Sequence, residues 1–286
     1  PSREPLRRRL ASLQAELPAR AARVRERLPW ADAAFATAER ELAAAGGLIA
    51  GGLAYRFFLW LVPFGLVCAS LLGLVVDYDR ESVEEAADEF GIGATSVASA
   101  AQAVEGDWRV LALLSGVVIL LWFSIGVVRA LRLSYCLAWG LERPRGLRRP
   151  LQGALALNGL VVGGVLLFGL LAWLREELGV GALLGAVALL ALQVAFALFV
   201  MTLLPSRAAS PRDLLPGAVL VAVGNQLVHV AVVFYFVPRL ERSSEVYGAL
   251  GTATVLLVWL YVVARLLTGA AFLNATLWER RQATTE

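Results

Sequence analysis

Long apolar stretches, separated by short polar ones, run along most of this chain. Six of them are long enough to cross a bilayer as helices, because about 20 residues at about 1.5 Å rise per residue span a hydrocarbon core of about 30 Å. These stretches are residues 46–76, 110–133, 151–174, 180–204, 215–237 and 247–277. The pattern therefore predicts an all-α, polytopic membrane protein whose six transmembrane helices form one domain, residues 46–278.

Polar segments flank or interrupt these helices. Residues 1–45 are expected to form one or two amphipathic helices at the cytoplasmic interface, which either grip anionic lipid headgroups or only enforce topology. They lack the short apolar core of a signal peptide, so we expect them to stay in the mature protein. The acidic connection 77–107 favours a short, solvated external helix over a calcium loop, because Ser82 stands where such a loop needs glycine. Residues 279–286 are expected to be a cytoplasmic tail.

The arginines indicate how the chain is oriented. All 26 basic residues are arginine, and outside the predicted helix centres nineteen lie on one side of the membrane and five on the other. Positively charged loops stay in the cytoplasm, so both termini are predicted to be cytoplasmic. The richer side holds the nine arginines before the first helix and Arg129, Arg132, Arg143, Arg145, Arg148, Arg149, Arg207, Arg212, Arg280 and Arg281.

Composition narrows the chemistry. The chain is 59% hydrophobic and 17% charged, whereas a soluble domain has roughly 45–50% apolar and about 25% charged residues. The net charge of +3 is too small to suggest a nucleic-acid partner. A single histidine excludes a His/Cys metal cluster, and Cys68 and Cys136 are expected to be packing residues. We predict no metal, no cofactor and no catalytic residues, and hence no enzyme, because no serine has a histidine or acid partner at a recognisable spacing.

Two arginines lie inside predicted helices, Arg56 in the first and Arg265 in the last. Burying arginine in hydrocarbon is costly, and no acidic residue lies deep in any of the six stretches, so we predict no internal counter-ion for either. One hypothesis is that a lipid phosphate or carboxylate bridges both arginines in a cavity, with Tyr55 beside them. The alternative is that each side chain reaches the membrane interface.

Polar residues in the other helices are further candidates for a ligand site. Asn225, Gln226 and His229 share one face of the fifth helix at spacings of three and four residues. Gln193 and Asn158 could line the same cavity. Alternatively, these side chains form interhelical hydrogen bonds that fix the bundle. Asn274 in the last helix could take part in either scheme.

Proline and glycine positions suggest how the helices move and pack. Pro63 interrupts the hydrogen bonding of the first helix and predicts either a hinge or a rigid kink. Three glycine pairs have the spacing that allows close helix approach, within the chain or in a homo-oligomer. These pairs are Gly47 and Gly51, Gly159 and Gly163, and Gly181 and Gly185.

Several segments in order resemble the YihY/virulence factor BrkB family of bacterial inner-membrane proteins. They are GGLAYRFFLWLVPFGLVCASLLGL, LLWFSIGVVRALRLSYCLAWGLERPRGLRRP, LLPSRAASPRDLLPGAVLVAV and YGALGTATVLLVWLYVVARLLTGAAFLNA. The chain departs from the family pattern at Arg56, Arg265 and Phe272. The resemblance implies a six-helix protein of the bacterial cytoplasmic membrane. An old family label, ribonuclease BN, implies a tRNA-processing activity that we do not transfer, because the chain offers no matching catalytic constellation.

The resemblance implies no defined activity, but the two arginines and the polar face of the fifth helix favour a transport-type protein that binds or moves a lipid-related or other anionic solute. Its expected partners are membrane lipids, anionic ones in particular. The competing interpretation is a structural or regulatory envelope protein that does not transport.

Overall fold

The computed structural model of the chain describes residues 29–75, 108–142, 150–177, 182–208, 210–231 and 237–284. Every regular element among them is helical, which confirms the all-α class for this part of the chain. The predicted external helix, residues 77–107, lies outside the described residues, as do residues 1–28. The elements are α2 (Pro29–Ala43), α3 (Gly46–Val75), α6 (Trp108–Ala138), α7 (Pro150–Glu177), α8 (Ala182–Thr202), η1 (Pro211–Leu214), α9 (Leu215–Ala231) and α10 (Val237–Ala283).

Five helices are long and apolar enough to cross a membrane: α3, α6, α7, α8 and α10. The predicted crossing at 215–237 corresponds to α9, whose 17 described residues extend about 26 Å and fall short of a hydrocarbon core of about 30 Å. Residues 232–236, which follow it, lie outside the described part. Five of the six predicted crossings are thus supported by length and composition, and the count of six stays a prediction.

The helix α10 is longer than the pattern predicts. It has 47 residues and already begins at Val237, whereas the apolar stretch begins at residue 247. The predicted tail after residue 278 continues the same helix as far as Ala283. Polar residues can extend a membrane helix beyond the bilayer, because water solvates their side chains there. Hydropathy detects only the apolar part of such a helix and therefore underestimates its length.

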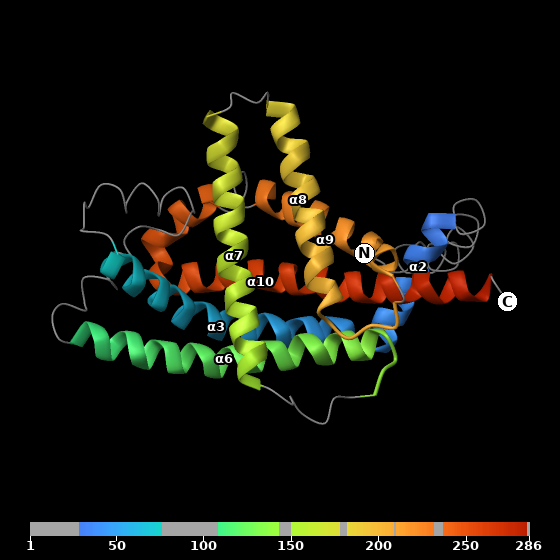
Figure 1. Cartoon of the computed structure of the whole chain (residues 1–286), viewed down its shortest axis with the longest axis horizontal. Helices are drawn as coiled ribbons and strands as arrows, with labels where there is room; N and C mark the ends of the chain where they lie inside the picture. Colours follow the sequence, from blue (N-terminus) through green and yellow to red (C-terminus); the bar gives the residue numbers. More distant parts are fainter. Residues whose placement is uncertain are drawn as a thin grey trace, which may run out of the picture.

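The three helices α3, α6 and α10 run side by side and form the centre of the fold (Figure 1). Their shared core contains Leu53, Trp60 and Val127, together with alanines such as Ala50 and Ala264. Figure 1 shows α7 and α8 running across the direction of this group. The helix α7 packs on α6, and α9 packs against both α8 and α10.

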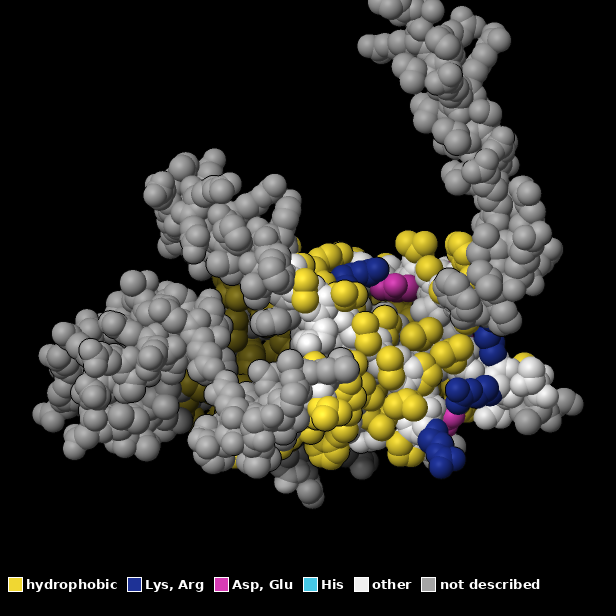
Figure 2. All heavy atoms as spheres, turned by 90° about the horizontal axis from the view of Figure 1, so that it is seen from above, with side chains coloured by type: hydrophobic (Ala, Val, Ile, Leu, Met, Phe, Trp, Pro, Cys, Tyr) yellow, Lys and Arg dark blue, Asp and Glu magenta, His cyan; other side chains and the backbone are white. Residues whose placement is uncertain are grey.

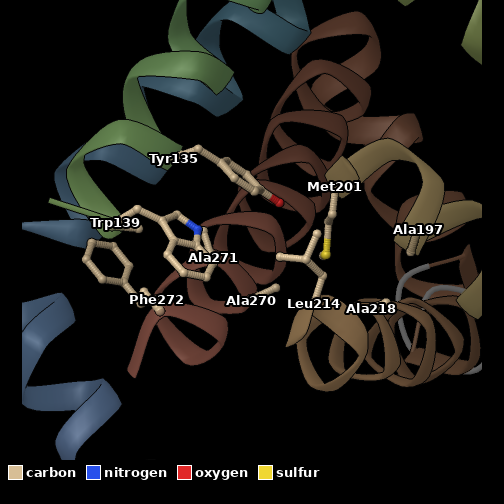
Figure 3. Packing of buried hydrophobic residues seen from close by; sticks show 11 residues of the cluster. Tyr135, Trp139, Ala197, Met201, Leu214, Ala218, Ala270, Ala271 and Phe272 are labelled. Carbon is tan, nitrogen blue, oxygen red and sulfur yellow. The ribbon is translucent and has the colours of Figure 1, made fainter. Parts of the chain in front are cut away.

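A second core cluster joins α6 to α8, α9 and α10 (Figure 3). The cluster contains Tyr135 of α6, Trp139 just after the end of α6, Met201, Leu214 and a group of small residues, and the Tyr135 side chain points toward Met201. The small residues are Ala197, Ala218, Ala270, Ala271 and Ala275. Alanine lets the backbones approach closely where lipid offers no hydrophobic drive, so this end of the bundle packs through small residues.

Some glycines outside the predicted pairs make close approaches. A Cβ on Gly116 would lie 3.3 Å from the Val67 side chain, and one on Gly164 would lie 2.9 Å from the Phe196 ring. By contrast, a Cβ on Gly51, Gly159 or Gly163 would meet nothing within 4 Å, and Gly181 lies outside the described residues. Gly159 and Gly163 thus contact no neighbouring helix among the described residues, and a partner molecule there stays a prediction.

The helix α2 packs against α10, with Ala31, Ala33 and Thr37 buried. The ion pairs between these helices include Arg40 to Glu279 at 2.5 Å and Arg280 to Asp32 at 2.8 Å. Part of the segment expected at the membrane interface therefore docks on the protein. Whether residues 1–45 also contact lipid stays a prediction.

The end of α6 shows how this docking satisfies backbone groups. Its last carbonyls have no partner within the helix. Arg40 donates from Nη2 to the Ala138 carbonyl at 2.8 Å, and Arg207 donates to the Gly140 carbonyl at 2.8 Å. Gly140 has φ +59°, a left-handed conformation that glycine adopts at low cost. Arg40 and Arg207 thus provide hydrogen-bond donors for backbone carbonyls at the C-terminal end of α6.

Candidate functional site

Arg265, on α10, forms an ion pair with Glu41 on α2. The side chain of Glu41 is 13% exposed and that of Arg265 is 38% exposed. The prediction that Arg265 has no internal counter-ion was therefore wrong. Glu41 precedes the first apolar stretch, and it reaches Arg265 because α2 folds back onto α10.

Two glycines at the start of α3 leave room for this ion pair. A Cβ on Gly47 would lie 3.9 Å from Tyr261 Oη and 4.0 Å from Arg265 Nη1. A Cβ on Gly46 would collide with the side chain of Glu41. Tyr261 and Arg265 are four residues apart on α10 and so share one face. The site therefore combines a guanidinium, a carboxylate and a phenol around two glycines where α2 gives way to α3.

Arg56 lies at a different helix contact. Its Nη1 donates to the Gly126 carbonyl of α6 at 3.4 Å, and a Cβ on Gly126 would lie 2.9 Å from the same nitrogen. Arg56 follows Gly47 by nine residues, which is about two and a half helical turns and puts it on the opposite side of α3. The structure gives Arg56 and Arg265 separate partners on α6 and α2.

Asn158 of α7 belongs to a polar cluster inside the core. Its Nδ2 donates to Ser124 Oγ at 2.7 Å and to the Ala154 carbonyl at 2.8 Å. Trp60 Nε1 donates to Ser124 Oγ at 3.0 Å and to Asn158 Oδ1 at 3.3 Å, and Ser124 donates to the Leu120 carbonyl. The cluster joins α3, α6 and α7. Trp60 and Ser124 were not predicted, because neither residue type stands out within an apolar helix.

Replacing Asn158 with alanine is expected to destabilise the bundle by about 1–2 kcal/mol, because two interhelical hydrogen bonds are lost in the low-dielectric core. The free energy of unfolding in a mixed detergent titration measures this change. The control is Ser134→Ala, since the contact that this hydroxyl makes with the described residues is a hydrogen bond to the Ala130 carbonyl of its own helix. Equal stability of the two variants would show that the cluster does not hold α7 in place.

The polar residues of α8 and α9 come together only in part. Gln193 Nε2 donates to Gln226 Oε1 at 3.5 Å, whereas Gln193 Oε1 is buried without a partner among the described residues. The side chain of Asn225 is exposed, and the side chain of His229 lies outside the described part. Tyr55 is also exposed. The ligand roles of these residues stay predictions.

Asn274 connects α10 to the first turn of α9. Its Oδ1 accepts from the Gly217 backbone N–H at 2.7 Å, and its Nδ2 donates to the Leu214 carbonyl at 3.1 Å. Asn274 has 0% exposure. The first N–H groups of a helix have no partner within it, so this amide caps α9 from another helix. Of the two roles open to Asn274, the structure supports interhelical hydrogen bonding.

Comparison with known protein families shows the family to which the chain belongs. Residues 38–286 match the family model described as virulence factor BrkB. The chain belongs to the virulence factor BrkB family. This membership confirms the resemblance seen in the sequence and, with the five apolar helices, identifies a multi-pass membrane protein. No curated protein and no solved structure matches the chain. The region matching the BrkB model includes Arg40 and Glu41 of α2, which pair with Glu279 and Arg265 of α10, and it begins after Asp32.

Proposed function

We propose that this BrkB-family protein is a transport-type protein that binds an anionic, lipid-related solute at Arg265. The main support for this proposal is the Arg265–Glu41 ion pair. A carboxylate from outside the apolar stretches already binds the Arg265 guanidinium there. A phosphate or carboxylate presents the same oxygen ligands and can exchange with Glu41.

Such an exchange links ligand binding to the position of α2. When an anion replaces Glu41, one of the contacts that hold α2 on α10 is lost. The Arg40–Glu279 and Arg280–Asp32 pairs remain, so α2 can shift locally without leaving α10. Ligand binding would thereby bias a segment at the membrane surface between two arrangements.

The proposal places the protein in the bacterial inner membrane, with both termini in the cytoplasm. The excess of arginine on the side that carries α2 and the end of α10 supports this orientation. Figure 2 shows a mainly hydrophobic face on which basic side chains lie beside acidic ones. Anionic lipids of the cytoplasmic leaflet would reach Arg265 from the cytoplasmic side of the membrane.

Reconstituted vesicles test the proposal directly. The protein is expected to speed the exchange of NBD-labelled phosphatidylglycerol between leaflets, measured by dithionite quenching. Uptake of inorganic phosphate forms a second arm, which separates a lipid substrate from a free anion. Rates equal to those of protein-free vesicles in both arms would rule out transport of either class.

One observation favours the competing function, an assembly role without transport. The helix α7 exposes aliphatic side chains such as Leu155, Val162 and Leu166, and its Gly159 and Gly163 adjoin open space. In a membrane, such a surface fits either lipid or the same face of a second copy.

Cysteine cross-linking distinguishes lipid from a second copy. With Cys68 and Cys136 replaced by alanine, Gly159→Cys is expected to form disulfide-linked dimers in membranes if α7 of one copy packs against α7 of a second copy. The matched control is Ala154→Cys, because Ala154 is buried within the chain. No dimer at Gly159, or equal dimer at both positions, would remove the assembly interpretation for α7.

A further inference from the structure

We propose that Arg56 and Arg129 form a headgroup site for an anionic phospholipid on the membrane-facing side of the contact between α3 and α6. This site is separate from Arg265 and does not depend on the transport function proposed above. It would hold a resident lipid, with the phosphate between the two guanidinium groups.

Both arginines lie on the same side of this helix contact. Arg56 reaches Gly126 of α6, and Arg129 follows Gly126 by three residues, which makes the two positions neighbours on the helix surface. Both arginine side chains are exposed in the structure. Gly126 leaves space for the guanidinium of Arg56, since a Cβ there would lie 2.9 Å from Nη1.

The surrounding residues identify this side as membrane-facing. Trp122 precedes Gly126 by one turn and is 77% exposed. Leu133 follows Arg129 by one turn and is also exposed. Large apolar side chains above and below two cations indicate acyl chains around a polar centre rather than bulk water.

Neither arginine has an acidic partner among the residues that the structure describes. The ion pairs in this part of the chain involve Arg40, Arg265, Arg280 and Arg281. Within the described part of the chain, the Arg56 guanidinium donates one hydrogen bond, to the neutral Gly126 carbonyl. Two unneutralised cations beside lipid attract an anion, and a phosphodiester matches the planar donor array of arginine.

Their depth in the membrane is compatible with a lipid phosphate. The 31 residues of α6 extend about 46 Å, so about 8 Å project beyond each side of a hydrocarbon core of about 30 Å when the helix is centred. Arg129 precedes the end of α6 by nine residues, or about 14 Å. It therefore lies about 6 Å inside the hydrocarbon boundary, where a long side chain extends toward the interface and draws a headgroup inward.

Native mass spectrometry from mixed vesicles of phosphatidylglycerol and phosphatidylcholine tests this site. Arg265→Leu serves as the background, so that a lipid at Arg265 cannot be counted. In this background we expect one retained phosphatidylglycerol, which Arg56→Leu/Arg129→Leu lowers at least about tenfold in occupancy because two charge-assisted contacts are lost. The charge-preserving pair Arg56→Lys/Arg129→Lys is expected to retain much of the lipid.

The control variant is Arg212→Leu, which removes an exposed arginine outside the apolar spans. Arg56→Gln/Arg129→Gln provides a second charge-removing variant if the leucine pair fails to fold. Equal retention of phosphatidylcholine, or unchanged phosphatidylglycerol in the folded charge-removing variant, would overturn the proposal. Displacement of the lipid by millimolar inorganic phosphate would also overturn it, because the site would then recognise a free anion.

Discussion

Replacing Arg265 with leucine is expected to weaken binding of NBD-phosphatidylglycerol by about 10- to 100-fold and to abolish its protein-dependent exchange between leaflets. Hydrogen bonds to charged groups contribute about 1.5–3 kcal/mol, and each 1.4 kcal/mol is about a tenfold change in affinity. Arg265→Lys keeps the charge but loses the fork of donors, so its lipid affinity should lie between that of the unaltered protein and that of Arg265→Leu. Fluorescence titration of the purified protein measures the change, with size-exclusion chromatography confirming folding.

Replacing Glu41 with glutamine is expected to change binding in the opposite direction. Glutamine keeps the shape of the side chain and removes the charge that competes for Arg265, so the lipid should bind about three- to tenfold more tightly. An ion pair that only stabilises the fold predicts instead that both substitutions lower stability and that neither improves binding. The opposite signs therefore separate competition from scaffolding.

The matched control for Glu41 is Glu279→Gln. This substitution breaks the Arg40–Glu279 ion pair between the same two helices without removing the carboxylate at Arg265. It is expected to leave lipid affinity unchanged. If it raises affinity as much as Glu41→Gln, release of α2 rather than competition explains the effect, and the role of Glu41 as a resident ligand is refuted.

The Arg265 site also shows where prediction from the sequence ends. Hydropathy locates the helix that carries Arg265, because about 20 apolar residues cross a membrane in only one regular way. It says nothing about the return of α2, which depends on the turn between α2 and α3. Ala45 has φ +53° at this turn, a conformation for which alanine gives no sequence signal. The sequence therefore does not identify Glu41 as the partner of Arg265.

The polar residues of the helices illustrate a related limit. Asn158 stands out as an amide in an apolar helix, and the structure confirms that it forms interhelical hydrogen bonds. Its partners Trp60 and Ser124 do not stand out, because indole and hydroxyl groups are common in membrane helices and often bond within their own helix. Composition identifies groups that need a partner, whereas packing decides which partner they find.

Asn274 is the position where loss of packing and loss of hydrogen bonding are expected to combine. Asn274→Ala removes the acceptor for the Gly217 N–H and the donor to the Leu214 carbonyl, both in a buried environment. Hydrogen bonds between membrane helices average about 0.6 kcal/mol and reach about 1.7 kcal/mol. Two such bonds, together with the cavity left by the side chain, predict a loss of about 2–4 kcal/mol in the free energy of unfolding.

The partner position Gly217 should show that this loss comes from the contact itself. A Cβ at Gly217 would overlap the Asn274 amide and lie 2.8 Å from the Ala270 carbonyl oxygen. Gly217→Ala is therefore destabilising alone, but in the Asn274→Ala background it costs less, because one of its two collisions is gone. Asn225→Ala, at an exposed amide of α9, is the control and should leave stability unchanged. Strictly additive effects at Gly217 and Asn274 would mean that the two residues do not hold α9 on α10 together.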